Sequence, residues 1–167
     1  MAAPLPYLFV DIDGVISLFG FDPASAPKGT YHVVDGIVHL LSATAGQHLR
    51  RLSDRFELVW CSGWEEKANE HLPKMLGIEP LPHVALDHAP GSGHWKLAPI
   101  ERYAGDRPLA WIDDALDDRC LAWADLRPAP TLLLECDPEV GITHDTVVAL
   151  LAWADRLGRG VQGPLEQ

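Results

Sequence analysis

Two carboxylates stand two residues apart where an apolar stretch of the chain ends. The stretch Leu5–Val10 is followed directly by Asp11, Ile12, Asp13 and Gly14. If the stretch is a strand, the side chains of Asp11 and Asp13 point the same way while Ile12 packs on the other side. One carboxylate can then attack phosphorus, and the other can protonate the leaving oxygen and later activate water. An ordinary Asp-Gly turn after a strand is the simpler alternative.

A second acidic group follows another apolar stretch, Leu109–Ile112. Asp113 and Asp114 come next, and Asp117 and Asp118 follow, which puts four acids within six residues. Clustered like charges are unfavourable unless a cation neutralises them, and Mg²⁺ prefers oxygen ligands. Asp117 and Asp118 also suit the start of a helix, where acids complement the helix dipole. Asp113 and Asp114 lie at the strand end itself, so we predict a metal site there.

Ser62, Gly63 and Lys96 are candidates for binding a phosphoryl group. Ser62 and Gly63 close a third apolar stretch, and a hydroxyl beside free backbone N–H groups at a helix N-terminus can bind phosphate. Ser62 with Glu65 also has the spacing of a capping box, which is a purely structural alternative. Lys96 precedes a predicted helix, where a cation is electrostatically unfavourable unless an anion shares the site. A solvated surface lysine is the alternative for Lys96.

The elements that would position these groups alternate along the chain. The apolar stretches predict strands at Leu5–Val10, Phe56–Cys61, Leu109–Ile112 and Thr131–Cys136, with a weaker one at His83–Leu86. Amphipathic patterns predict helices at Thr44–Leu52, Glu65–Leu76, Asp117–Leu126 and His144–Leu157, and one that begins near Pro99. This alternation predicts a three-layer, Rossmann-like α/β fold with a mostly parallel sheet of about five strands. In such sheets, ligands bind beyond the carboxyl ends of the strands.

One stretch does not follow the alternation. Residues 14–42 are rich in Pro, Gly and Ser, and they contain Asp35-Gly36 between alternating apolar residues. Such a pair is a strong hairpin signal, so we predict a β-hairpin over Thr30–Leu41 that projects as a small flap. With Asp35 and Gly36 as the turn, His32 and His39 fall opposite each other on one face. They either reach a substrate or remain a solvated pair.

The composition is typical of a globular protein. The chain has 167 residues, is 47% hydrophobic and carries a net charge of −11. This acidity disfavours nucleic acid as a partner, because basic groups supply most of that affinity. Three widely spaced cysteines, Cys61, Cys120 and Cys136, favour reduced thiols in the cytoplasm. No stretch is long and apolar enough for a membrane span, so we expect one cytoplasmic domain over residues 1–167.

The order of these motifs resembles that of the haloacid dehalogenase (HAD) superfamily. Asp-x-Asp, then Ser, then Lys, then Asp-Asp each stand at or just after a predicted strand end, over nearly the whole chain. The Ser-Gly-Trp-Glu and Ala-Trp-Ile-Asp-Asp segments are similar to those of small HAD-like hydrolases. With only about thirty residues available for a cap, the resemblance implies a rather open site. Such a site suits a bulky substrate or a neighbouring subunit that acts as a lid.

The resemblance also implies roles for individual residues. Asp11 would be the nucleophile and Asp13 the acid/base, while Ser62, Gly63 and Lys96 would bind the phosphoryl group. The implied activity is Mg²⁺-dependent hydrolysis of a phosphomonoester, with a phosphorylated small molecule as substrate. Action on nucleic-acid ends and a noncatalytic HAD-fold binding module are the alternatives. The candidate Mg²⁺ ligands are Asp11, Asp13, Asp113 and Asp114.

Overall fold

A parallel sheet of four strands forms the centre of the molecule. The computed structural model describes residues 2–86 and 94–160. Its strands lie in the order β5 (Glu57–Trp60), β1 (Tyr7–Val10), β6 (Leu109–Asp113) and β7 (Thr131–Glu135). Strands β1 and β6 are central and almost wholly buried, as their continuous apolar sequences require. The predicted α/β architecture with a parallel sheet is therefore confirmed.

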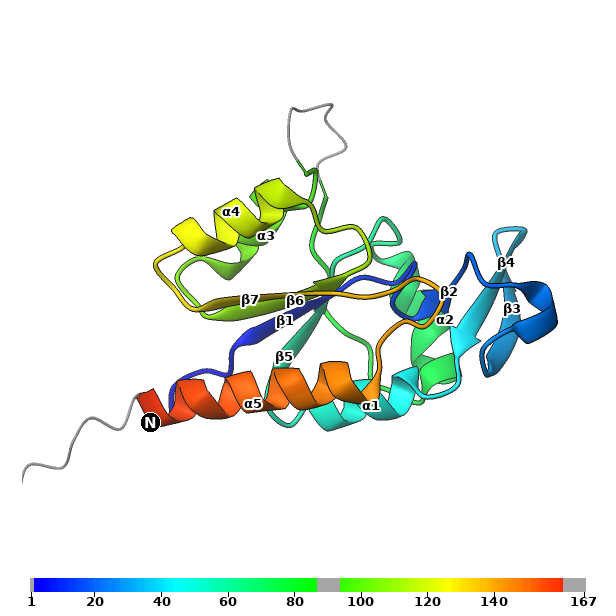
Figure 1. The fold of residues 1–167 in the computed structure, drawn as a ribbon, viewed down its shortest axis with the longest axis horizontal. Coiled ribbons are helices and arrows are strands. Elements are labelled where there is room, and N and C mark those ends of the chain that lie inside the picture. The colour runs from blue at the N-terminus through cyan, green and yellow to red at the C-terminus, as the bar shows by residue number, and fades with distance from the viewer. Residues whose placement is uncertain (1, 87–93, 161–167) are drawn as a thin grey trace, which may run out of the picture.

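Helices cover both faces of this sheet (Figure 1). The first face packs against α1 (Ala45–Leu52), α2 (Lys67–Leu76) and α5 (His144–Gly160). The opposite face packs against α3 (Leu97–Ala104) and α4 (Asp118–Leu126). The two faces bury separate hydrophobic clusters, so the molecule has the three layers that the sequence predicts.

Strand β1 shows how the alternation of side chains builds both clusters. Leu8 and Val10 belong to the cluster under α1, α2 and α5, whereas Phe9 belongs to the cluster under α3 and α4. All three side chains are fully buried. The strand is thereby fixed from both sides, and Asp11, the next residue, is held in place at its carboxyl end.

The flap is a small antiparallel sheet that lies beyond the carboxyl end of β1 (Figure 1). It consists of β2 (Ser17–Leu18), β4 (Ile37–Ser42) and β3 (Gly29–Val34), in that order, with a short 3₁₀ helix at Pro23–Ser25. Asp35 and Gly36 have φ angles of 51° and 80°, as a two-residue hairpin turn requires. The predicted hairpin is confirmed, and the two-residue strand β2 is an addition.

The weaker strand predicted at His83–Leu86 is reduced to an isolated bridge. Within the described residues, His83 pairs with Trp60 alone: the Trp60 N–H donates to the Pro82 carbonyl at 2.8 Å, and the Val84 N–H donates to the Trp60 carbonyl at 2.9 Å. Pro80 and Pro82 lack the N–H groups that a strand would donate, which limits pairing here. In the part of the chain that the structure describes, the main sheet therefore has four strands rather than the predicted number of about five.

The three cysteines are buried and form no disulfide. Burial raises the pKa of the Cys61 thiol above its ordinary value, which keeps this group protonated and unreactive. Within residues 2–86 and 94–160, no helix is both long and apolar enough to cross a membrane.

Candidate functional site

Three neighbouring strands bring the predicted site residues to one edge of the sheet. Asp11 directly follows β1, Asp113 ends β6, and Ser62 lies two residues after β5. Because β1 lies between β5 and β6, the three groups converge at the carboxyl ends of the strands. The central position of β1 places Asp11 between the other two.

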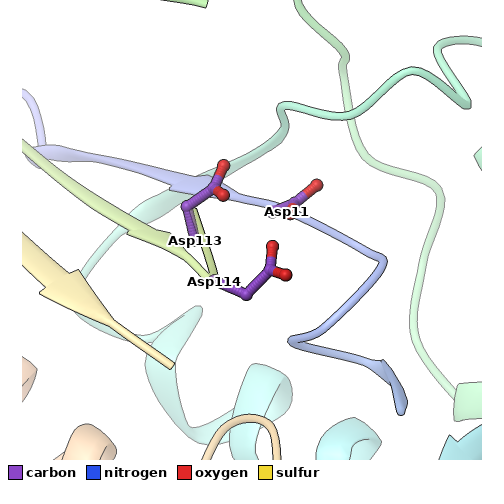
Figure 2. A group of neighbouring side chains, drawn as sticks. All are labelled: Asp11, Asp113 and Asp114. Atoms are coloured by element: carbon purple, nitrogen blue, oxygen red, sulfur yellow. The ribbon is translucent and has the colours of Figure 1, made fainter. Parts of the chain in front are cut away.

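Asp11, Asp113 and Asp114 form a compact acidic group. Their side chains point toward one another in Figure 2, from the ends of β1 and β6. One carboxylate oxygen from each lies within 4.8 Å of the others, and Asp11 and Asp113 are only 5% and 1% exposed. This oxygen-only arrangement is of the kind that holds Mg²⁺. The three residues were all predicted as metal ligands.

Gly14 makes room for this group. A Cβ atom at Gly14 would lie 2.4 Å from Cγ of Asp114, and the Gly14 φ angle of +84° is one that side-chain-bearing residues rarely adopt. The loop turns tightly here, because the Gly14 N–H donates to the Ser17 carbonyl at 2.7 Å. A glycine is required at this position for both reasons.

Lys96 is buried within the acidic group. Its Nζ atom lies 3.0 Å from Oδ1 of Asp11 and 2.6 Å from Oδ2 of Asp113. Burial alone would lower the pKa of Lys96, but the attraction of Asp11 and Asp113 outweighs it and raises that pKa above its ordinary value. Lys96 is therefore a permanent cation, and the alternative of a solvated surface lysine is wrong.

The charges in this group do not balance. Three ionised carboxylates against one ammonium leave two negative charges in a largely buried place. Burial raises the pKa of Asp11 to about 8, with Lys96 opposing the rise and Asp113 adding to it. Burial also raises the pKa of Asp114. A divalent cation would supply the missing charge and favour the ionised form of these acids, so the donor set fits Mg²⁺.

The hydrogen bonds of Asp113 distinguish it from the other two acids. Its Oδ2 atom accepts from Lys96 Nζ at 2.6 Å and from Trp111 Nε1 at 3.2 Å, while its Oδ1 atom accepts from the Ala115 N–H at 3.0 Å. A carboxylate has about four acceptor positions, so Asp113 has most of its capacity in use. These three donors fix the position of the Asp113 carboxylate.

Ser62 and Gly63 lie beside Asp11 in the loop after β5. Ser62 is 2% exposed, and its Oγ accepts a weak hydrogen bond from the Trp64 N–H at 3.3 Å. Helix α2 begins only at Lys67, and Glu65 has a φ angle of +46°, which a first helical turn does not allow. The capping-box alternative for Ser62 is therefore wrong.

Asp13 lies outside the compact acidic group. Its side chain is 52% exposed, and its Oδ2 accepts from Trp64 Nε1 at 3.1 Å. Its Oδ1 lies 3.8 Å from Nδ1 of His39, which in turn is 2.8 Å from Ser17 Oγ. Asp13 therefore faces the flap, and its role as a fourth metal ligand stays a prediction.

The two flap histidines have different positions. They pair across β3 and β4 as predicted, but His32 is hydrogen-bonded to Thr30 Oγ1 at 2.7 Å on the exposed side of the hairpin. His39 packs edge-on against Trp64, with ring centroids 4.9 Å apart. His39 is thus the flap histidine that lies next to a predicted site residue, Asp13.

A cavity of about 290 Å³ connects these groups. It brings together all seven predicted site residues and exposes them to a common space. Trp95, which adjoins Lys96 in the sequence, also contributes. Phe19, His94 and Ala115 were not predicted: Phe19 follows the short strand β2 in the flap, and His94 accepts from the Lys96 N–H and bonds the Ala115 carbonyl. The lining consists of Asp11, Asp13, Phe19, Ser62, Gly63, His94, Trp95, Lys96, Asp113, Asp114 and Ala115.

A protein-family model matches most of this chain, including all the residues of the site. The family is described as the HAD domain in Swiss Army Knife RNA repair proteins, and the match covers residues 7–147. The chain belongs to this family. The expected membership of the HAD superfamily is thereby confirmed, and the four strands and the flap all lie within the matched residues.

Three solved structures are similar to this chain at low sequence identity. A candidate HAD superfamily (subfamily III A) hydrolase from Legionella pneumophila is 17% identical, with a TM-score of 0.50 over 98% of this chain and 91% of that one. A candidate 3-deoxy-D-manno-octulosonate 8-phosphate phosphatase from Vibrio cholerae is 17% identical, with a TM-score of 0.46 over 97% and 88%. A hypothetical protein from Xanthomonas campestris is 12% identical, with a TM-score of 0.49 over 94% and 87%. No curated protein matches the sequence. At these identities the likeness concerns the fold of the HAD domain.

Proposed function

We propose that this HAD domain is a Mg²⁺-dependent phosphomonoester hydrolase that works through an aspartyl-phosphate on Asp11. The observation that carries the proposal is the arrangement around Asp11. This carboxylate is buried against Lys96 at 3.0 Å, stands beside two further acids and opens to the cavity. A carboxylate held by a cation is suited to attack an anionic phosphoryl group, because the local charge offsets the repulsion.

Two transfers make up the reaction. In the first, an Asp11 carboxylate oxygen attacks phosphorus, the ester bond breaks, and Asp13 gives its proton to the departing oxygen. In the second, Asp13 takes a proton from water, whose oxygen attacks the aspartyl-phosphate and releases inorganic phosphate with Asp11 regenerated. Asp13 suits both roles because it is half-exposed and faces the flap, where leaving group and water have access. The net reaction consumes one water per ester.

The remaining residues bind and orient the phosphoryl group. Ser62 Oγ, the backbone N–H groups near Gly63 and Lys96 Nζ line the same cavity and offer donors to phosphoryl oxygens. When bound by Asp11 and Asp114, Mg²⁺ would supply charge stabilisation for the transferred group. Asp113, by its hydrogen bonds to Lys96 and Trp111, would fix Lys96 in place. Asp13 is not one of the Mg²⁺ ligands in this proposal. That it binds the metal stays a prediction from the sequence.

A phosphatase acting on nucleic-acid ends is the second candidate. It is favoured by the description of the matching family, which comes from RNA repair proteins. The chain itself carries a net charge of −11. Among the described residues that line the cavity, Lys96 is the single lysine, and there is no arginine. Polyanion binding normally requires several such groups. The small-molecule substrate is therefore our first choice.

A chromogenic ester tests the proposal. We expect p-nitrophenyl phosphate to be hydrolysed in Mg²⁺ and not in chelator, and Asp11→Asn to abolish turnover. Asp125→Asn, an exposed acid of α4 away from the cavity, is the matched control and should retain activity. Turnover that survives in chelator, or in Asp11→Asn, would contradict the proposal. A binding module would give no turnover in any of these conditions.

A further inference from the structure

Two aromatic side chains line the catalytic cavity without belonging to its phosphate or metal groups. Phe19 and Trp95 are 48% and 42% exposed, and both line the space that Asp11 and Lys96 share. Single exposed apolar side chains are common on protein surfaces, and Leu126 on α4 is an example at 84%. Phe19 and Trp95 differ from such scattered side chains, because both line the cavity that contains the proposed nucleophile, Asp11. They offer flat apolar surface where a substrate must pass.

Trp95 lies beside Gly63 and Lys96, two of the residues proposed to bind the phosphoryl group. Its Cη2 atom lies 3.6 Å from the point where a Cβ atom on Gly63 would be, and its ring centroid is 5.6 Å from Lys96 Nζ. Phe19 lines the cavity from the flap side, and its backbone is held where its N–H donates to the Pro138 carbonyl at 3.0 Å. The two rings thus come from segments far apart in the sequence and frame the same opening.

The size of the cavity places the rest of the substrate next to these rings. At about 290 Å³ the cavity is at the lower limit of ligand pockets, and the donors and acids occupy much of its lining. The part of the ester beyond the phosphoryl group must then lie at the opening, in contact with Phe19 and Trp95. Aromatic side chains bind flat rings well, because the faces of the two rings stack on each other.

The charge of the lining limits the number of phosphates. Lys96 is the single lysine or arginine among the described lining residues, and it is already paired with Asp11 and Asp113. Residues 87–93 and 161–167, outside the described part of the chain, contain neither lysine nor arginine. The described lining of the cavity therefore offers no second lysine or arginine to a further phosphate.

We propose that the site takes a phosphomonoester whose leaving group carries a flat ring and no further phosphate, of the nucleoside monophosphate class. Phe19 and Trp95 stack on the ring while Asp11 attacks the phosphorus. This inference rests on the proposed phosphatase function and adds the substrate class to it.

Selectivity between two esters tests the inference. The probes are a nucleoside 5′-monophosphate and ribose 5-phosphate, which differ by the base alone. We expect Phe19→Leu and Trp95→Leu each to lower kcat/KM for the nucleotide by roughly 5- to 100-fold, the equivalent of one stacking contact. For ribose 5-phosphate, Phe19→Leu should change kcat/KM less than twofold, and Trp95→Leu should lower it by a clearly smaller factor than for the nucleotide, because Trp95 also borders the residues proposed to bind the phosphoryl group. Tyr31→Leu is the matched control, because Tyr31 is 62% exposed on the flap but does not line the cavity. It should leave both values unchanged.

Different outcomes separate failure of the inference from failure of the function. Equal losses on both esters, or no loss on the nucleotide, would overturn the stacking role while leaving the phosphatase intact. A terminally phosphorylated oligonucleotide that is hydrolysed faster than the mononucleotide, with kcat/KM falling steeply in salt, would overturn the restriction to one phosphate. Absence of hydrolysis on every ester, p-nitrophenyl phosphate included, would instead refute the proposed function and the inference with it.

Discussion

A methyl group added at Gly14 should damage the metal site far more than the fold. Gly14 and Gly36 have nearly the same φ angle, +84° and +80°, so alanine is strained at both positions to a similar extent. That strain costs about 1 kcal/mol. At Gly36 a Cβ atom meets nothing within 4 Å, whereas at Gly14 it lies 2.4 Å from Cγ of Asp114. Gly36→Ala is therefore a control that isolates the contact with Asp114.

The size of the expected effect follows from that contact. Carbon atoms pack at roughly 3.5–4.0 Å, so Asp114 must move by about 1 Å or more to accommodate the new methyl group. A displacement of about 1 Å in an active site can cost roughly 10²-fold in rate. We expect Gly14→Ala to lower kcat/KM by about that factor and to weaken Mg²⁺ binding by at least about tenfold. Gly36→Ala should match the wild type in both.

The assay combines three measurements on each variant. Urea unfolding in chelator gives the stability, calorimetric titration gives the affinity for Mg²⁺, and p-nitrophenyl phosphate gives the turnover. The backbone strain of each glycine substitution should lower the free energy of unfolding by only about 1 kcal/mol. If Gly14→Ala binds Mg²⁺ and turns over ester as well as Gly36→Ala does, then Asp114 is not a ligand and our account of the site is wrong.

Three further predictions concern the neighbours of Asp11. Lys96→Met removes the cation paired with both Asp11 and Asp113 and should cost about 3–5 kcal/mol of unfolding free energy in chelator, whereas Asp113→Asn leaves Lys96 paired with Asp11 and should cost less. The double variant should lose about 0.5–3 kcal/mol less than the sum of the two, and strict additivity would contradict the pairing. Because the pKa of Asp11 is raised to about 8, its proton must leave before a cation binds, so Mg²⁺ affinity should rise from pH 6 to pH 8 with proton release in calorimetry. An affinity that is constant over this range would refute the assignment. Trp64→Phe removes the indole donor at 3.1 Å from Asp13 and should lower kcat roughly three- to tenfold with little change in KM, whereas a change confined to KM would contradict a positioning role.

The sequence predicted those parts of the site that strands position. Apolar stretches buried on both faces, such as β1 and β6, can be recognised from their residues, and the acids that follow them must lie at the same edge of the sheet. This is why Asp11, Asp113 and Asp114 could be placed together before the structure was known. Lys96 was recognised for a different reason, because a cation before a helix needs an anion nearby.

The parts that the sequence did not predict depend on contacts between distant segments. Trp64 donates to Asp13 across 51 residues, and no local pattern indicates such a pair. Phe19 lies in an irregular loop whose path is fixed by β2, a strand of two residues that is too short to show a period. Ser62 fits a capping box by spacing alone, but the positive φ of Glu65 delays the helix and makes that geometry impossible.

Trapping of the phosphorylated protein tests the central claim most directly. In Asp13→Asn, Asp11 can still attack p-nitrophenyl phosphate, whose leaving group needs no proton, but no base remains to activate water. We expect a burst of one p-nitrophenolate per protein, steady-state turnover reduced by roughly 10²–10⁴-fold, and one added phosphoryl group in intact-protein mass spectra. Asp11→Asn should show neither burst nor adduct. An adduct on Asp11→Asn, or wild-type turnover in Asp13→Asn, would contradict the mechanism.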